Sequence, residues 1–112
     1  MITVNVKRHA DHTVAEVTID GHAGFANPGE DIVCAAVSGI SFGMLNAIEM
    51  LLKTPLAVTQ GEDGYLRCAV PQEYPEELRE KVQLLLEGMI ASLKSVALEY
   101  GSFVKVNDKK KR

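Results

Sequence analysis

Basic charge and aromatic side chains are both scarce in this chain of 112 residues. It carries 12 lysines and arginines against 15 aspartates and glutamates, for a formal net charge of −3. Proteins that bind nucleic acids usually present a basic face, so this balance argues against a general nucleic-acid binder. Aromatic residues make up 5% of the sequence and tryptophan is missing, which also counts against a module that binds RNA.

Long apolar runs and cysteines are few as well. No stretch approaches 18 consecutive apolar residues, so no transmembrane helix is expected. Residues 1–9 lack the basic and apolar regions of a signal peptide. The two cysteines, Cys34 and Cys68, are too few for the disulfide framework of a small secreted protein, although a disulfide between them stays open. We therefore expect a cytoplasmic protein with no membrane partner.

The residues that are present suffice for one domain with one core. Hydrophobic residues make up 46% of the chain, and a chain of this length buries roughly two-thirds of its unfolded surface. Residues 2–7 alternate apolar and polar side chains, as in a half-buried strand. Further short strands are expected at residues 13–19, 56–59, 65–70 and 102–106. Helical periodicity covers residues 31–52 and 75–100, so the order ββαββαβ predicts an α/β (α+β) fold, a two-layer sandwich of two helices on a mixed sheet of about five strands.

The two expected helices each have one apolar face. In the first helix the side chains expected to face the core are Val33, Val37, Ile40, Met44, Ile48 and Leu51. In the second helix they are Leu78, Val82, Leu85, Met89, Leu93, Val96 and Tyr100. The opposite, solvent-facing side of the second helix is expected to carry Arg79, Glu80, Gln83, Glu87 and Lys94. The first helix is also rich in small residues, which let either the sheet or a second subunit approach closely.

Candidate chemistry lies in residues 21–39. His22 closes the second strand, a loop covers residues 21–30, and Cys34 lies in the first turn of the helix. The thiolate is the nucleophilic form of cysteine, and a helix N-terminus favours negative charge. An adjacent histidine can take the thiol proton, and the free N–H groups of the first turn can hold an oxyanion. The pattern indicates a base and a nucleophile, while a buried, inert cysteine is the simpler interpretation.

Gly21-His22-Ala23-Gly24, followed by Asp31-Ile32-Val33-Cys34-Ala35-Ala36-Val37-Ser38, resembles the ribosomal-processing cysteine protease family, Prp. The similarity extends over nearly the whole chain in length and element order, and the matched positions show no departure. The resemblance implies a homodimeric, cytoplasmic cysteine endopeptidase. It implies that the enzyme removes a short N-terminal extension from a large-subunit ribosomal protein, cutting after an aromatic residue. It also implies that Cys34 and His22 form the catalytic pair.

Other residues of this segment have roles that the sequence leaves open. Asp31 is expected to cap the helix, and the alternative is that it also orients His22 as the third member of a triad. Ser38, one turn beyond Cys34, either contacts substrate or simply packs. The loop is expected to open for an extended peptide and close on it through its glycines, Gly21, Gly24 and Gly29. A plain surface connection is the alternative for this loop.

No cofactor and no metal site are expected. His9 and His12 lie in a polar connection without a nearby cysteine or second ligand pair, so they are expected to be solvated. Cys68 lies in a strand and is expected to be a small core hydrophobe. A thiol-redox or metal protein is a rival, but Cys-x-x-Cys does not occur, and His22, Cys34 and Cys68 make at most three conventional zinc ligands.

A further alternative is a non-enzymatic, ribosome-associated binding module that uses the C-terminal residues Lys109-Lys110-Lys111-Arg112 on RNA. Four basic residues at a frayed end are more typical of a solubilising tail. We therefore expect one cysteine protease domain over residues 1–112, a disordered basic tail at 109–112, and no direct nucleic-acid contact.

Overall fold

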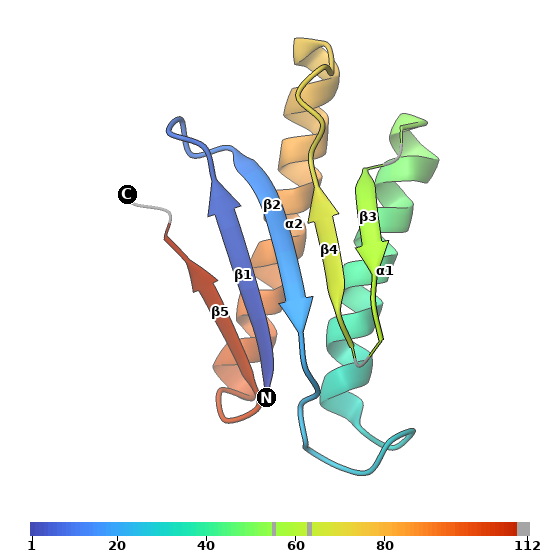
Figure 1. Ribbon diagram of the computed structural model, residues 1–112, viewed down its shortest axis with the longest axis vertical. Helices are drawn as coiled ribbons and strands as arrows, with labels where there is room; N and C mark the ends of the chain where they lie inside the picture. The colour runs from blue at the N-terminus through green and yellow to red at the C-terminus, as the bar shows by residue number, and fades with distance from the viewer. Residues whose placement is uncertain (55, 63, 110–112) are drawn as a thin grey trace.

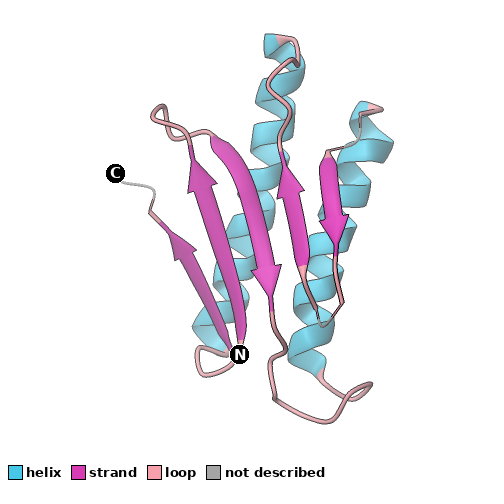
Figure 2. Cartoon of the chain, viewed as in Figure 1, coloured by secondary structure: helices cyan, strands magenta, loops and turns pink. Residues whose placement is uncertain are grey.

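The chain folds as two layers, a five-stranded sheet and two helices that cover one face of it (Figures 1 and 2). The computed structural model describes residues 1–54, 56–62 and 64–109. The strands among them are β1 (Ile2–Arg8), β2 (Val14–Asp20), β3 (Ala57–Gln60), β4 (Leu66–Ala69) and β5 (Val104–Asp108). The helices are α1 (Ile32–Leu52) and α2 (Glu76–Glu99). The predicted order ββαββαβ and the α+β class are confirmed.

The sheet is mixed, as expected, with the strand order β3-β4-β2-β1-β5. Strand β1 pairs antiparallel with β2 and parallel with β5, and β4 pairs antiparallel with both β2 and β3. Strand β2, in the middle of the sheet, has its C-terminal end near the N-terminus of α1 (Figure 1). That topology brings the loop after Asp20 beside the first turn of α1.

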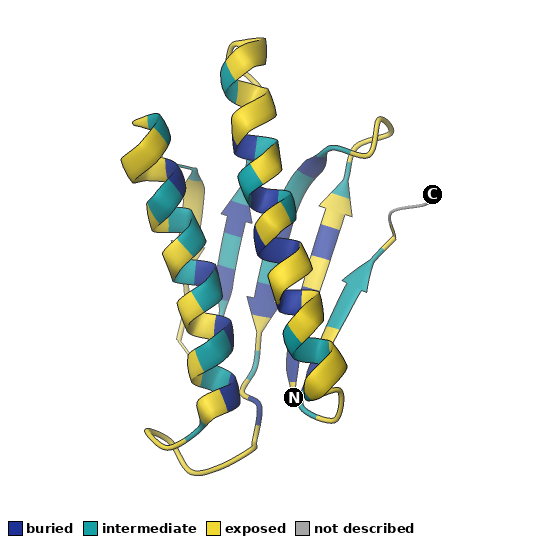
Figure 3. Cartoon of the chain, turned by 180° about the vertical axis from the view of Figure 1, so that it is seen from behind, coloured by how far each residue is buried: buried dark blue, intermediate teal, exposed yellow. Residues whose placement is uncertain are grey.

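The core lies between the sheet and the helices. In β1 the side chains of Ile2, Val4 and Val6 are buried, because alternate residues of a strand face the same side. Figure 3 shows the helices from outside, with their exposed residues toward the viewer and their buried residues toward the sheet. The last strand begins at Val104, later than expected, because residues 101–103 form a turn.

Both helices depart in detail from the expected core faces. Leu51 was expected inside but is 69% exposed, and Leu52, four residues after Ile48, packs against the core in its place. In α2, Leu86 and Ile90 are fully buried although the predicted stripe omitted them. Because α2 lies over the middle of the sheet, its buried face is wider than one narrow stripe.

Helix α1 is, by length and composition alone, long and apolar enough to cross a membrane. The sequence expectation considered only unbroken apolar runs, and polar residues such as Ser38, Ser41 and Asn46 interrupt this one. In the structure one face of α1 packs in the core through Val33, Val37 and other residues, and core helices of globular domains pass the same test.

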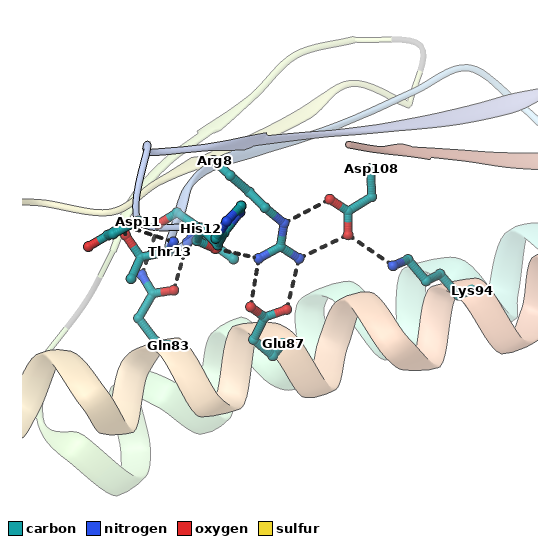
Figure 4. Close-up of polar contacts among 9 residues, drawn as sticks. Arg8, Asp11, His12, Thr13, Gln83, Glu87, Lys94 and Asp108 are labelled. Atoms are coloured by element: carbon teal, nitrogen blue, oxygen red, sulfur yellow. Dashed lines mark hydrogen bonds and ion pairs between the residues drawn. The ribbon is translucent and has the colours of Figure 1, made fainter. Parts of the chain in front are cut away.

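Two polar side chains of α2 that were expected on the solvent side, Gln83 and Glu87, are half-buried and bond to the sheet (Figure 4). Lys94 is exposed, as expected, and still reaches Asp108 of β5. The Gln83 amide accepts a hydrogen bond from the Val14 N–H at 2.7 Å and donates one to the Val14 carbonyl oxygen at 2.8 Å. Glu87 binds Arg8, a residue of β1. The prediction was wrong for Gln83 and Glu87 because their partners come from strands distant in sequence.

Arg8 is the centre of this polar network. Its guanidinium donates to both carboxylate oxygens of Glu87, at 2.6 and 2.9 Å, and to both of Asp108, at 2.8 and 2.9 Å. Lys94 also pairs with Asp108, at 2.9 Å. The hydrogen bonds and charge of Arg8, and then those of Lys94, hold the pKa of Asp108 well below its usual range. The network ties α2 to the C-terminal ends of β1 and β5.

Candidate active site

Asp31 is the N-cap of α1, as expected, and it also holds the preceding loop. Its Oδ1 accepts the backbone N–H groups of Val33 at 3.0 Å and Cys34 at 2.9 Å. Its Oδ2 accepts those of Phe25 at 3.0 Å and Ala26 at 3.3 Å. These backbone hydrogen bonds, that of Cys34 foremost, lower the pKa of Asp31. One carboxylate therefore joins the loop to the helix start.

Cys34 lies half-buried in the first turn of α1, and its sulfur has a backbone donor. The N–H of Ala23 points at Cys34 Sγ, with 3.3 Å between nitrogen and sulfur. The expectation that first-turn N–H groups are free for an oxyanion is wrong for Val33 and Cys34, because Asp31 occupies both. The donor at the sulfur comes from the loop instead.

His22 and Cys34 open into one cleft of about 630 Å³ between the loop and α1. Ser38 and Asp31 line the same cleft, and Gly24 and Gly29 line it from the loop. The histidine is exposed. In the described part of the chain no hydrogen bond involves the His22 ring, and both carboxylate oxygens of Asp31 bind backbone N–H groups, so the contact that an orienting Asp31 would need is missing.

The loop has the backbone that its glycines were expected to allow, with φ of 94° at Gly21, 72° at Gly24 and 85° at Gly29. It is also anchored at Phe25, whose ring packs edge-on against Tyr100 at 5.8 Å and Phe103 at 5.2 Å between centroids. Sequence reasoning missed this anchor, since its partners lie at the far end of the chain. Opening and closing of the loop stays a prediction.

The β3–β4 hairpin is a second neighbour of His22 that sequence reasoning missed. A Cβ atom on Gly64 would lie 2.6 Å from the Gly21 carbonyl oxygen and 3.3 Å from His22 Cε1. Gly64 also has a φ of 77°, which favours glycine. Gly64 therefore lies so close to Gly21 and His22 that no side chain fits between them. Gly64 indicated a turn, but no local pattern indicated that this turn lies beside His22.

The other candidate residues do not join this site. His9 and His12 are exposed, and within residues 1–54, 56–62 and 64–109 no group of three or more His, Cys, Asp or Glu side chains can hold a metal ion. Cys68 is 2% exposed, as expected of a core hydrophobe, and burial raises the pKa of its thiol to about 11. Both cysteines are free thiols. Most of the predicted tail, residues 110–112, lies outside the described residues.

Comparisons of the sequence and of the structure with known proteins find the same family. Residues 1–105 match the family described as cysteine protease Prp. The ribosomal processing cysteine protease Prp of Bacillus subtilis is 37% identical over 107 residues, covering 95% of this chain and 96% of the relative. The protein of the same name from Mycoplasma pneumoniae is 35% identical, covering 99% of this chain and 98% of the relative.

A solved structure shares the fold as well. It is the crystal structure of an essential ribosomal processing protease Prp from S. aureus, in complex with a covalently linked product peptide. It is 31% identical, with a TM-score of 0.85 over 96% of this chain and 98% of the other. The chain described above therefore belongs to the cysteine protease Prp family, and it is a cysteine protease.

Proposed function

We propose that this protease removes the N-terminal extension of a large-subunit ribosomal protein, cutting after an aromatic residue. The observation that carries the proposal is the shared cleft, in which Cys34 and His22 face a space of about 630 Å³ that is open to a peptide. The names of the relatives, ribosomal processing proteases, support the substrate class. The covalently linked product peptide of the S. aureus protein supports a covalent intermediate.

In the proposed mechanism the Cys34 thiol gives its proton to the His22 ring, and the sulfur attacks the scissile carbonyl carbon. The carbonyl oxygen becomes an oxyanion, and the Ala23 N–H, which donates to Cys34 Sγ, lies where it can donate to that oxygen. His22 then protonates the leaving amine, the C–N bond breaks, and a thioester remains on Cys34. Water, deprotonated by His22, hydrolyses the thioester and regenerates the thiol.

The remaining site residues have supporting roles in this proposal. Asp31 sets the positions of Cys34 and the loop through its four backbone hydrogen bonds. Ser38 contacts the substrate from the wall of the cleft. The loop moves about its glycines to admit the peptide and cover it. No cofactor takes part, and we propose that the enzyme works as a cytoplasmic homodimer without contacting nucleic acid.

The test is cleavage of the extended ribosomal protein from the same organism, with the new N-terminus read by mass spectrometry. We expect Cys34→Ala and His22→Ala each to lower kcat/KM by at least about 10³-fold, because nucleophile and base act as one unit. The matched controls Cys68→Ala and His9→Ala remove the same side chains outside the cleft and should still cleave. Full cleavage by Cys34→Ala, or a new N-terminus that does not follow an aromatic residue, would contradict the proposal.

A further inference from the structure

Three aromatic rings meet where the loop of residues 21–30 passes the end of α2. The Phe25 ring lies edge-on to Phe103, with centroids 5.2 Å apart and planes at 77°, and to Tyr100, at 5.8 Å and 87°. The whole chain has three phenylalanines and three tyrosines, so half of these rings gather here. Edge-on pairs at such distances attract each other beyond the effect of buried area. Phe25, Tyr100 and Phe103 form this aromatic cluster.

Backbone hydrogen bonds fix the base of the aromatic cluster. The Tyr100 N–H donates to the Val96 carbonyl oxygen at 2.8 Å, and the Phe103 N–H donates to the Tyr100 carbonyl oxygen at 2.8 Å. The Phe103 carbonyl oxygen in turn accepts the Ile2 N–H, at 2.8 Å. The turn that carries Tyr100 and Phe103 is therefore tied both to α2 and to β1, so both rings have a fixed place beside the loop.

Phe25 extends this fixed position to the loop. Every residue from 24 to 30 is exposed, and Phe25 is the only aromatic residue among them. Its N–H donates to Asp31 Oδ2 at 3.0 Å, so its backbone is held as well as its ring. Two residues earlier, the Ala23 N–H points at Cys34 Sγ, with 3.3 Å between nitrogen and sulfur. The aromatic cluster thus holds the loop directly beside the one donor that reaches the sulfur.

We propose that the aromatic cluster positions the Ala23 N–H at the Cys34 sulfur, so that Tyr100 and Phe103 act on the nucleophile through the loop. A hydrogen bond to the charged form of a group favours that form. In the proposed mechanism, on which this inference rests, the same N–H then meets the oxyanion. Tyr100 and Phe103 are positioning residues, because neither is among the described residues that line the catalytic cleft.

The experiment uses the full-length protein and three changes in the aromatic cluster. Phe103→Leu and Tyr100→Leu each remove one ring, whereas Tyr100→Phe keeps the ring. Tyr74→Leu is the matched control, since Tyr74 is also a half-buried ring packed against the core, but in the connection between β4 and α2. Thermal unfolding verifies that each variant is folded at the assay temperature.

Two readouts are taken for each variant. Steady-state kinetics on a peptide that the wild type cleaves separate kcat from KM. Alkylation of Cys34 by iodoacetamide, located by peptide mapping, gives a pH profile whose plateau reports access to the sulfur and whose midpoint reports its ionisation. His22 and Asp31, the other titratable side chains that line the cleft, are the same in every variant.

We expect Phe103→Leu and Tyr100→Leu each to lower kcat about tenfold and to change KM less than about twofold, because a displaced oxyanion donor is lost mainly from the transition state. The midpoint of the alkylation profile should move to higher pH, since a displaced N–H no longer favours the charged sulfur. Tyr100→Phe and Tyr74→Leu should keep both values. A loss confined to KM, an unmoved midpoint, or a lower unfolding temperature with unchanged kcat would overturn the proposal.

A double-variant cycle separates an effect through Phe25 from a direct effect of Phe103. When the contact between the two rings carries the effect, Phe25→Leu combined with Phe103→Leu loses no more kcat than Phe25→Leu alone. Losses that multiply would also overturn the proposal. The alkylation profile needs no substrate, so it tests the aromatic cluster even where the extended ribosomal protein is not cleaved, which is the failure that contradicts the proposed function.

Discussion

Cys34 and Cys68 carry the same side chain in two opposite environments. Cys34 is half-buried at a helix start and lines an open cleft, whereas Cys68 is closed in the core between sheet and helices. Burial raises the pKa of the Cys68 thiol to about 11, so only about one molecule in a thousand carries a Cys68 thiolate at pH 8.

We therefore predict that iodoacetamide at pH 8 modifies one thiol of the folded protein, and that peptide mapping assigns it to Cys34. Cys68 should react only after unfolding in denaturant, because in the folded protein its thiol is buried and its pKa is raised. Cys34→Ala is the control and should show no rapid modification. Labelling of Cys68 in the folded protein at the rate of Cys34 would be inconsistent with this structure.

Because Gly64 has no side chain, the Gly21 carbonyl and the His22 ring can lie directly against its backbone. A Cβ atom there would be forced against the Gly21 carbonyl oxygen and the His22 ring. We predict that Gly64→Ala lowers kcat by about 10- to 100-fold, because a displacement of about 1 Å at a reacting group costs this much. The pH dependence of kcat should shift as well, since His22 is the group displaced.

Gly88→Ala is the matched control for this prediction, because a Cβ atom there meets nothing within 4 Å. It should keep the activity and the pH profile of the wild type. If Gly64→Ala merely lowered the unfolding temperature and left kcat and its pH profile unchanged, the turn would be a structural element without influence on His22.

At the scale of the elements, the Arg8–Asp108–Glu87 network joins β1, β5 and α2. The Asp108 side chain is 1% exposed and the Arg8 side chain 6%, so this is a buried ion pair. We predict that Asp108→Asn lowers the free energy of unfolding at pH 7 by about 2 kcal/mol, because the buried Arg8 guanidinium loses one of its charged hydrogen-bond partners and keeps Glu87. Urea unfolding measures the loss, and Glu99→Gln, an exposed change on α2, should stay within about 0.5 kcal/mol of the wild type.

The sign of the pH dependence follows from the lowered pKa of Asp108. A carboxylate with a lowered pKa in the folded state contributes its full stability above its unfolded pKa, about 3.9, and loses it as the pH falls toward the folded value. The difference between wild type and Asp108→Asn should be constant above about pH 5 and should narrow below pH 4. A difference that widened in acid would contradict the assignment.

At the scale of the whole molecule, α1 leaves an uncharged outer face. No Asp, Glu, Lys or Arg occurs from residue 32 to residue 48, and Ala35, Gly39, Gly43 and Asn46 are exposed. Helix α2 carries charged residues along its exposed side instead, such as Glu80 and Lys94. A small, uncharged helix face lets a second backbone approach closely, which supports the proposed homodimer.

We predict a mass of two chains of 12.2 kDa each by light scattering at micromolar concentration. Gly43→Lys should give the mass of one chain while the protein stays folded, because a Cβ atom at Gly43 meets nothing within 4 Å and the added charge would lie in the proposed interface. Gly88→Lys on α2 should remain a dimer. A wild-type mass of one chain would contradict the dimer proposal.

The sequence by itself determined the elements and the helix start. The alternation in β1, the periodicity of Val33, Val37 and Ile48, and the cap at Asp31 are local patterns, because each depends on the geometry of neighbouring residues alone. The motif around His22 and Cys34 identified the family for the same reason, as it is read within a single stretch of chain.

Only the tertiary structure decided which distant residues meet. Three features join segments far apart in sequence: the close approach of Gly64 to Gly21 and His22, the packing of Phe25 against Tyr100 and Phe103, and the bond between Glu87 and Arg8. Such contacts depend on strand order and on how the helices lie over the sheet, which no local pattern encodes. A cavity beneath the β3–β4 hairpin belongs to this second class, since its walls come from β2, α1 and the hairpin together.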